Sequence, residues 1–149
     1  MKNIFVSRFN LLILLLLLFA CMGKNKSDDN EIYDIKRENI QIRDPFVYVD
    51  QKTKTYYVPA NSGSNTIMLY KSKDLENWKN IGDVFIPDSI FWGKKDFWAP
   101  DLFEYKGKYY LFVTFSSETG MRGTSILVAD NPEGKYKPQI GRASCRERV

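Results

Sequence analysis

Apolar and polar positions along residues 101–115 follow the pattern of an antiparallel hairpin. The mostly apolar residues 102–105 precede Lys106-Gly107-Lys108, and an aromatic and β-branched run follows that turn. Apolar stretches on both sides of a short glycine turn are typical of two tightly joined strands. The pattern therefore predicts a β-hairpin, with Asp101 at the mouth of its first strand, directly after Pro100.

The same order of residues occurs earlier in the chain. Asp44 precedes a predicted strand, a polar turn follows at residues 50–54, and Tyr56-Tyr57 belong to the returning strand. Asp44 and Asp101 lie 57 positions apart. The repeat indicates that two copies of one β-module follow each other.

Each hairpin is followed by a further predicted strand, at residues 66–70 and 124–128, and residues 84–86 are predicted as the outer strand of the first copy. Units of roughly 40 to 60 residues with three or four short strands are typical of β-propeller blades. We therefore expect an all-β fold in which residues 39–140 form two blades. Because a closed ring takes roughly four blades or more, we expect the chain to be the front part of a longer protein.

Residues 1–20 are predicted to be a signal peptide. Leu11–Phe19 is an unbroken apolar run after a basic segment, and its length fits a signal peptide better than a membrane span. The sequence Leu18-Phe19-Ala20-Cys21 resembles a bacterial lipobox, so Cys21 is the candidate lipidation site. The alternative is an ordinary signal peptide with an incidental cysteine.

Residues 21–38 are expected to be a flexible tether, because they are polar and charged and lack hydrophobic periodicity. With the lipobox, this predicts an exported bacterial membrane lipoprotein, in the periplasm or at the cell surface. At the other end, residues 141–149 carry no strand pattern and resemble translated vector sequence. We expect that tail to be non-native.

The charge of the predicted body is balanced. Residues 21–141 contain 17 basic and 17 acidic side chains, so the sequence predicts no basic surface for nucleic acid. The chain has no histidine, and its two cysteines, Cys21 and Cys145, lie outside the predicted blades. Histidine-dependent nucleophiles, thiolate metal sites and disulfides are therefore excluded from the blades, and we expect no cofactor or metal there. Carboxylates remain as the acid–base groups.

Asp44 and Asp101 are the candidate catalytic residues. Each blade of a propeller presents its first strand to the axis, so carboxylates that start the first strands of adjacent blades are expected to face one cavity. Paired carboxylates in a concave site are the groups that hydrolyse glycosidic bonds. The alternative is structural, because an aspartate beside a proline is also a common turn residue.

Four segments, in this order, resemble glycoside hydrolase family 43: Ile42-Arg43-Asp44-Pro45-Phe46-Val47-Tyr48, Tyr56-Tyr57, Tyr70-Lys71-Ser72-Lys73-Asp74-Leu75-Glu76-Asn77-Trp78 and Phe97-Trp98-Ala99-Pro100-Asp101. The resemblance covers about residues 40–138. It implies a five-bladed β-propeller, of which about the first two blades are present. It also implies an enzyme that hydrolyses β-xylosides, α-L-arabinofuranosides or arabinans with inversion. The expected partner is an oligosaccharide or polysaccharide, with membrane contact only through the lipid anchor.

The resemblance also implies roles for the two aspartates. Asp44 matches the general base that activates water, and Asp101 matches the aspartate that tunes the pKa of the acid and orients it. The acid is a glutamate of a later blade, and neither Glu104 nor Glu118 lies at the mouth of an inner strand. The fragment is therefore expected to be inactive alone. The central metal of some relatives would also belong to later blades.

Phe46 and Trp98 flank the aspartates and are the candidate substrate-binding residues, as apolar walls for a sugar ring. Packing between blades is the alternative for both. Arg43 is expected either to favour the ionised form of Asp44 or to face solvent.

Two other functions fit parts of the pattern. A non-catalytic propeller that binds glycans at the cell surface would need no inward-facing glutamate in its later blades. A retaining enzyme of the invertase type also has an aspartate–proline motif. There the aspartate usually follows asparagine, whereas Arg43 precedes Asp44 here.

Overall fold

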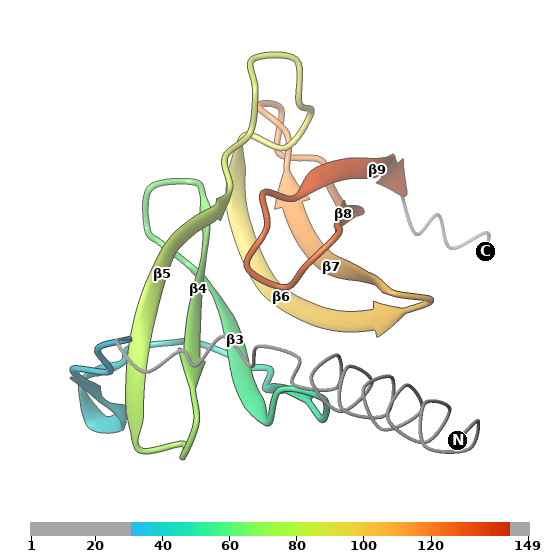
Figure 1. Ribbon diagram of the computed structural model, residues 1–149. Coiled ribbons are helices and arrows are strands. Elements are labelled where there is room, and N and C mark those ends of the chain that lie inside the picture. Colours follow the sequence, from blue (N-terminus) through green and yellow to red (C-terminus); the bar gives the residue numbers. More distant parts are fainter. Residues whose placement is uncertain (1–30, 144–149) are drawn as a thin grey trace, which may run out of the picture. The chain divides into compact units, whose positions relative to one another are not determined.

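The computed structural model describes residues 31–143, with side chains described through Gln139. The predicted signal peptide, Cys21 and residues 144–149 lie outside the described residues. Within them, every regular element except one short 3-10 helix is a β-strand (Figure 1). That helix is far too short to cross a membrane, so residues 31–143 contain no candidate spanning helix. The prediction of an all-β fold is confirmed.

The first sheet has five antiparallel strands in the order β1-β5-β4-β3-β2. Their bounds are Ile35–Lys36 (β1), Tyr48–Asp50 (β2), Thr55–Asn61 (β3), Ile67–Ser72 (β4) and Asn77–Phe85 (β5), and the 3-10 helix η1 spans Arg37–Asn39. The predicted hairpin turn joins β2 to β3. Its first residue closes it, because Asp50 Oδ1 accepts a hydrogen bond of 2.9 Å from the Lys52 amide.

The second sheet has four antiparallel strands in the order β6-β7-β8-β9. Their bounds are Lys95–Tyr105 (β6), Lys108–Ser116 (β7), Arg122–Ala129 (β8) and Lys137–Ala143 (β9). The β6–β7 turn is the predicted Lys106-Gly107 turn, and Lys106 and Gly107 have φ of 50° and 76°. Two consecutive left-handed residues suit a tight hairpin, and glycine adopts that conformation without strain.

Three boundaries differ from the predictions. The first sheet begins at Ile35, inside the predicted tether, because β1 pairs with Trp78 and Asn77 of β5. The last strand continues to Ala143, inside the predicted non-native tail, because that residue pairs with Thr124. The strand predicted at residues 84–86 as the outer strand is the end of β5, which starts at Asn77 and has β1 on its outer side. In each case cross-strand pairing extends a segment that has little apolar pattern of its own.

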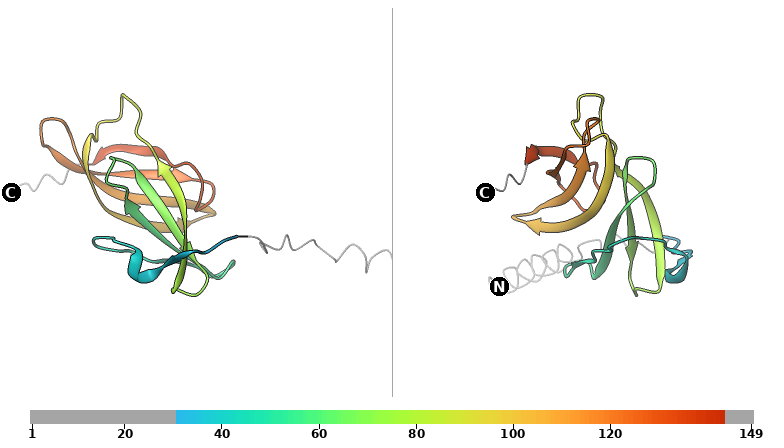
Figure 2. Two further views of the ribbon diagram at one scale, coloured as in Figure 1. Left: turned by 90° about the vertical axis from the view of Figure 1, so that its left-hand side faces the viewer. Right: turned by 180° about the vertical axis from the view of Figure 1, so that it is seen from behind.

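The core lies between the two sheets. Phe85 of β5 stacks on Phe97 of β6 at 6.5 Å between ring centres and meets Phe115 of β7 edge-on at 6.1 Å. Leu102 and Leu111 are fully buried in the same cluster. In Figure 1 and in both views of Figure 2, β3 lies beside β6. Burial of these rings and aliphatic side chains holds the two sheets together.

The turn between β8 and β9 also joins the sheets. Its Glu133 carboxylate accepts hydrogen bonds from Lys71 Nζ at 2.9 Å and from the Tyr57 hydroxyl at 3.2 Å, both in the first sheet. The Lys71 side chain is only 6% exposed, so its charge is paired out of water. The Tyr136 amide donates to the Val84 carbonyl at 2.8 Å. A segment of the second sheet thus completes the polar contacts of the first.

Candidate active site

A cavity of about 500 Å³ lies where the segment before β2 meets the start of β6. Its lining comes from residues 41–44, from Ala60, Asn61 and Gly63 at the end of β3, from residues 97–100 of β6 and from Thr114 of β7. We call it the Asp44 cavity. Elements of both sheets form its wall, so the packing of the core fixes its shape.

Asp44 is held at this cavity by an unusual backbone conformation. Its φ is 52°, in the left-handed region, where aspartate occurs more readily than most residues. Its side chain is 72% exposed and forms an ion pair of 3.6 Å with Arg43, itself 92% exposed. Such an exposed pair contributes little to stability. Arg43 therefore faces solvent, the second of the two alternatives foreseen for it, and pairs with Asp44 there.

The structural alternative for Asp44, a turn residue, can be judged against aspartates that have this function. Asp50, Asp74 and Asp88 each accept backbone amide hydrogen bonds two or three residues further on. Among the described residues, Asp44 has Arg43 as its partner and accepts no backbone amide. Its carboxylate is thus left for a ligand or for water.

Asp101 does not line the Asp44 cavity. It borders a separate hollow of about 730 Å³, which we call the Asp101 hollow. This hollow is lined by Asp101, residues 103–105, Tyr110, Phe112, Ile126 and Gln139. Leu102 faces the core between the sheets, and successive residues of a strand point to opposite faces, so Asp101 faces away from that core, on the side of its partner Phe112. The expectation that both aspartates face one cavity is not met within residues 31–143.

Two β-bulges shape β6 beside the Asp44 cavity. The pairing shifts register between Lys95 and Trp98 and again between Trp98 and Asp101. Bulges bend a strand and redirect its side chains. Ala99, inside the second bulge, has φ of 44°, and Trp98 is 41% exposed at the cavity wall. The bulges thus turn an indole ring outward from a strand whose neighbouring Phe97 is fully buried.

Phe46 and Trp98 were predicted together as walls of a sugar site, and the structure separates them. Trp98 lines the Asp44 cavity. Phe46 lies outside its lining and packs on Phe103 of β6, with 5.0 Å between ring centres. Phe46 therefore matches the alternative foreseen for it, packing between blades.

The sequence interpretation missed the loop after β3. Asn61 and Gly63 line the Asp44 cavity, and Asn61 Oδ1 accepts the Gly63 amide at 2.7 Å. Because the amide oxygen must face that N–H, the Asn61 NH2 group points elsewhere and can donate to a ligand. The polar sequence Asn61-Ser62-Gly63 after an apolar strand was the signal that could have indicated it.

The shifted pKa values of the described residues lie away from this cavity. Burial, then the nearby Tyr109 and carboxylates, raises the pKa of Tyr48 to about 12. Burial, then Glu133, raises the pKa of Tyr57 as well. These tyrosines belong to the interface between the two hairpins. No group of three or more His, Cys, Asp or Glu residues within the described part is placed to hold a metal ion.

Comparisons with known proteins agree with this architecture. The chain matches the crystal structure of an endo-arabinase from Bacteroides thetaiotaomicron with 50% identity and a TM-score of 0.72, over 76% of this chain and 39% of that one. A β-xylosidase of Xylanibacter ruminicola is 38% identical over 61 residues, which are 41% of this chain and 19% of the relative. An extracellular exo-α-(1→5)-L-arabinofuranosidase of Cellvibrio japonicus is 27% identical over 105 residues, 64% of this chain and 29% of the relative.

The chain thus spans well under half of each of these relatives, which fits two blades of a larger propeller. The profile of glycosyl hydrolases family 43 matches residues 39–146, a range that includes the Asp44 cavity and every strand of the two sheets except β1. This chain therefore belongs to glycosyl hydrolases family 43.

Proposed function

We propose that the chain is the N-terminal part of an inverting glycoside hydrolase that cleaves pentose-containing plant polysaccharides, with Asp44 as the general base. The observation that carries this proposal is an exposed carboxylate, free of turn hydrogen bonds, beside an exposed tryptophan in one cavity of a family 43 protein. A carboxylate in such a position can take a proton from the water that attacks the sugar.

Arabinan is the substrate that we propose to test first. The structure of 50% identity is that of an endo-arabinase, and the exo-arabinofuranosidase also matches 64% of this chain. Because a β-xylosidase is 38% identical over 61 residues, we propose β-xylosides as the second substrate to test. Arabinose and xylose are both pentoses, so a site of similar size and the same chemistry serves either.

The two sheets supply a candidate base for the reaction but no candidate acid. Inversion requires an acid on the face of the sugar opposite the base. Glu104 borders the Asp101 hollow and Glu118 lies in the loop before β8, so neither lines the Asp44 cavity. We propose that the acid is a glutamate of a later blade and that residues 1–149 alone are inactive. The role of Asp101 in tuning that acid stays a prediction from the motif alone, and its place in the Asp101 hollow argues against it.

We also propose that the protein is exported. One relative is an extracellular enzyme, and a polysaccharide substrate lies outside the cell. Lipidation of Cys21 remains a prediction from the sequence. Replacing Cys21 by serine should release the protein from the membrane fraction while leaving its specific activity unchanged.

The test of function uses the complete reading frame with linear arabinan, aryl α-L-arabinofuranosides and aryl β-xylosides. We expect hydrolysis, an inverted product anomer by NMR, and loss of activity in Asp44→Asn. Asp130→Asn is a suitable control, because that carboxylate is 86% exposed and pairs with Lys108 at the other end of β7. Unchanged turnover by Asp44→Asn would refute the role of the base. Sugar binding without any hydrolysis would favour the glycan-binding alternative.

A further inference from the structure

We infer that Arg122 is a positioning residue of this site, which holds the indole of Trp98 as a wall for the sugar. The Arg122 guanidinium lies over the Trp98 ring at 4.4 Å from its centre. Trp98 lines the Asp44 cavity, and Arg122 lies outside that lining. The inference rests on the proposed function, since it gives Arg122 a task in binding the same substrate.

The sheet register explains how Arg122 reaches the ring. Trp98 of β6 pairs with Thr114 of β7, and Arg122 of β8 pairs with Ser116 of β7. Thr114 and Ser116 are two residues apart and share a face of the sheet. The Arg122 side chain therefore crosses β7 diagonally to meet an indole on the strand beyond it.

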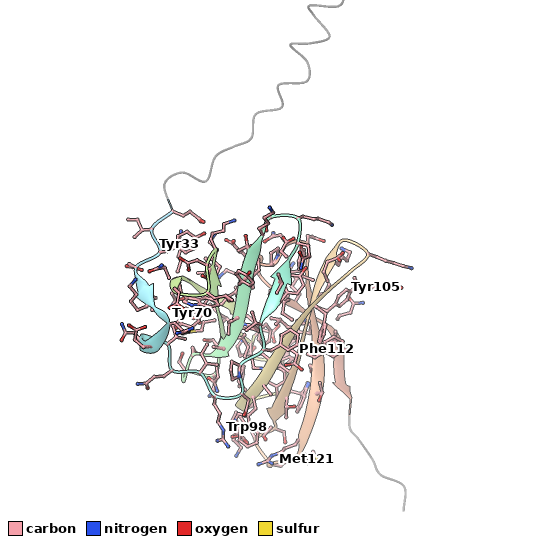
Figure 3. The ribbon with its side chains drawn as sticks, turned by 90° about the horizontal axis from the view of Figure 1, so that it is seen from below. Tyr33, Tyr70, Trp98, Tyr105, Phe112 and Met121 are labelled. Carbon is pink, nitrogen blue, oxygen red and sulfur yellow. The ribbon has the colours of Figure 1, made fainter. Side chains whose placement is uncertain are left out.

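The loop before Arg122 has fixed ends. The Ser117 amide donates to the Met121 carbonyl at 2.9 Å, and the Gly120 amide donates to the Ser117 carbonyl at 3.0 Å. Figure 3 shows Met121 and Trp98 at the same end of the second sheet. The backbone that carries Arg122 is thus set by hydrogen bonds, although its side chain is exposed.

Trp98 needs such a restraint. Trp98 is 41% exposed on a bulged strand, so packing alone leaves the orientation of its ring weakly fixed. Tryptophan offers the strongest ring for a cation, and the planar guanidinium stacks on it. With Arg122 on one face, the indole keeps the other face for the C–H groups of a sugar. Fixing a binding wall in advance lowers the entropic cost of binding.

The chain provides a matched control. Lys106 lies over the Tyr105 ring at 5.2 Å, in the β6–β7 turn. Figure 3 shows Tyr105 at the end of the sheet remote from Trp98. Lys106→Met removes a contact of the same kind without touching the Asp44 cavity.

The test measures kcat and KM of the complete protein with arabino-oligosaccharides. We expect Arg122→Met to raise KM about threefold to fivefold with kcat nearly unchanged, because a wall contact acts on the ground state and the transition state alike. Arg122→Lys, which restores a cation, should recover most of the loss, and Lys106→Met should match the wild type. In a Trp98→Ala background, Arg122→Met should add almost nothing.

Two results would overturn the inference: an unchanged KM in Arg122→Met, or an equal rise of KM with and without Trp98. A second readout needs no activity. Iodide quenching of the fluorescence that Trp98→Phe abolishes should change in Arg122→Met and stay constant in Lys106→Met. If the wild type hydrolyses no pentoside, the proposed function fails, and this quenching still decides whether Arg122 holds Trp98. Unaltered quenching would refute that contact.

Discussion

Asp44 and Asp101 occupy equivalent places in the sequence repeat and very different places in the structure. Asp44 precedes β2 by four residues, with a left-handed backbone and a 72% exposed side chain. Asp101 lies inside β6, paired with Phe112 of β7, and faces a different hollow. Equal spacing along the chain thus did not produce equal surroundings for the two carboxylates.

The residue that follows each aspartate accounts for this difference. Pro45 has no N–H and is exposed, so the β2 ladder starts only at Tyr48. Leu102 is fully buried and pairs with Leu111, so the strand runs straight through Asp101. A proline frees the carboxylate of the first blade from the sheet, whereas a core leucine keeps that of the second blade in the strand.

The largest expected effect contrasts the two carboxylates directly. In the complete enzyme, Asp44→Asn should reduce kcat/KM by about 1000-fold or more, because the attacking water loses its base. Asp101→Asn should reduce it by less than about tenfold, since its carboxylate borders the other hollow. Initial rates on an aryl arabinofuranoside give both values. Equal losses would show that the two carboxylates act at one site after all.

The second contrast concerns the neighbours of the aspartates. Leu102→Ala should lower the free energy of unfolding by about 2–5 kcal/mol, because it leaves a cavity among fully buried side chains. Pro45→Ala should change it by less than about 1 kcal/mol, since that ring is exposed. Urea unfolding followed by tryptophan fluorescence measures both. Similar values would mean that Pro45 supports the fold as much as Leu102 does.

Much of this architecture could be predicted from the pattern of apolar and polar residues along the chain. The two hairpin turns and the third strands were predictable because alternating apolar residues flank Gly107 and the polar residues 50–54. The short β1 and the far end of β9 were missed. Their pairing is decided by partners distant in sequence, and neither segment has an apolar pattern of its own.

The site was only partly predictable. Asp44 and Trp98 were identified from motifs, and both line the cavity. The bulges of β6 could not be predicted, since a register shift depends on the strand opposite. The expectation that Asp101 lines the same cavity as Asp44 assumed a regular strand there, whereas Asn61 was overlooked although its polar sequence could have indicated it.

A third contrast concerns the second bulge of β6, which lies between Trp98 of the Asp44 cavity and Asp101 of the Asp101 hollow. Ala99 has φ of 44°, a conformation that a β-branched residue resists more than alanine does. Ala99→Val should therefore lower the free energy of unfolding by about 1–2 kcal/mol. Ala99→Gly should leave it within about 1 kcal/mol of the wild type. A tolerated valine, measured by thermal unfolding, would argue against the bulge.

The smallest expected effect is a pH dependence at the tyrosines that follow the aspartates. Tyr48 stacks on Tyr57 at 6.4 Å, whereas Tyr105, four residues after Asp101, is 60% exposed. Because the pKa of Tyr48 is raised to about 12, its neutral form is favoured in the folded state. Stability is therefore complete below about pH 10, the pKa of tyrosine in an unfolded chain, and falls as the pH rises towards 12.

Tyr48→Phe should make that alkaline fall of stability shallower, because phenylalanine has no proton to lose. Urea midpoints at pH 8, 10 and 11.5 measure the change. The value at pH 8 serves as the internal control for lost packing. An identical slope in the variant would show that Tyr48 ionises as easily in the folded protein as in the unfolded chain.

The turn that joins β8 to β9 limits where the protein can be truncated. Glu133 partners the buried Lys71 of the preceding sheet, and the Tyr136 amide caps the Val84 carbonyl. A first blade produced alone would lose this contact with Glu133 and would expose the Phe85 ring that packs on Phe97 and Phe115 of the second sheet. Such a piece should aggregate or be digested rapidly, so a fragment designed from this region should keep the first sheet together with the second.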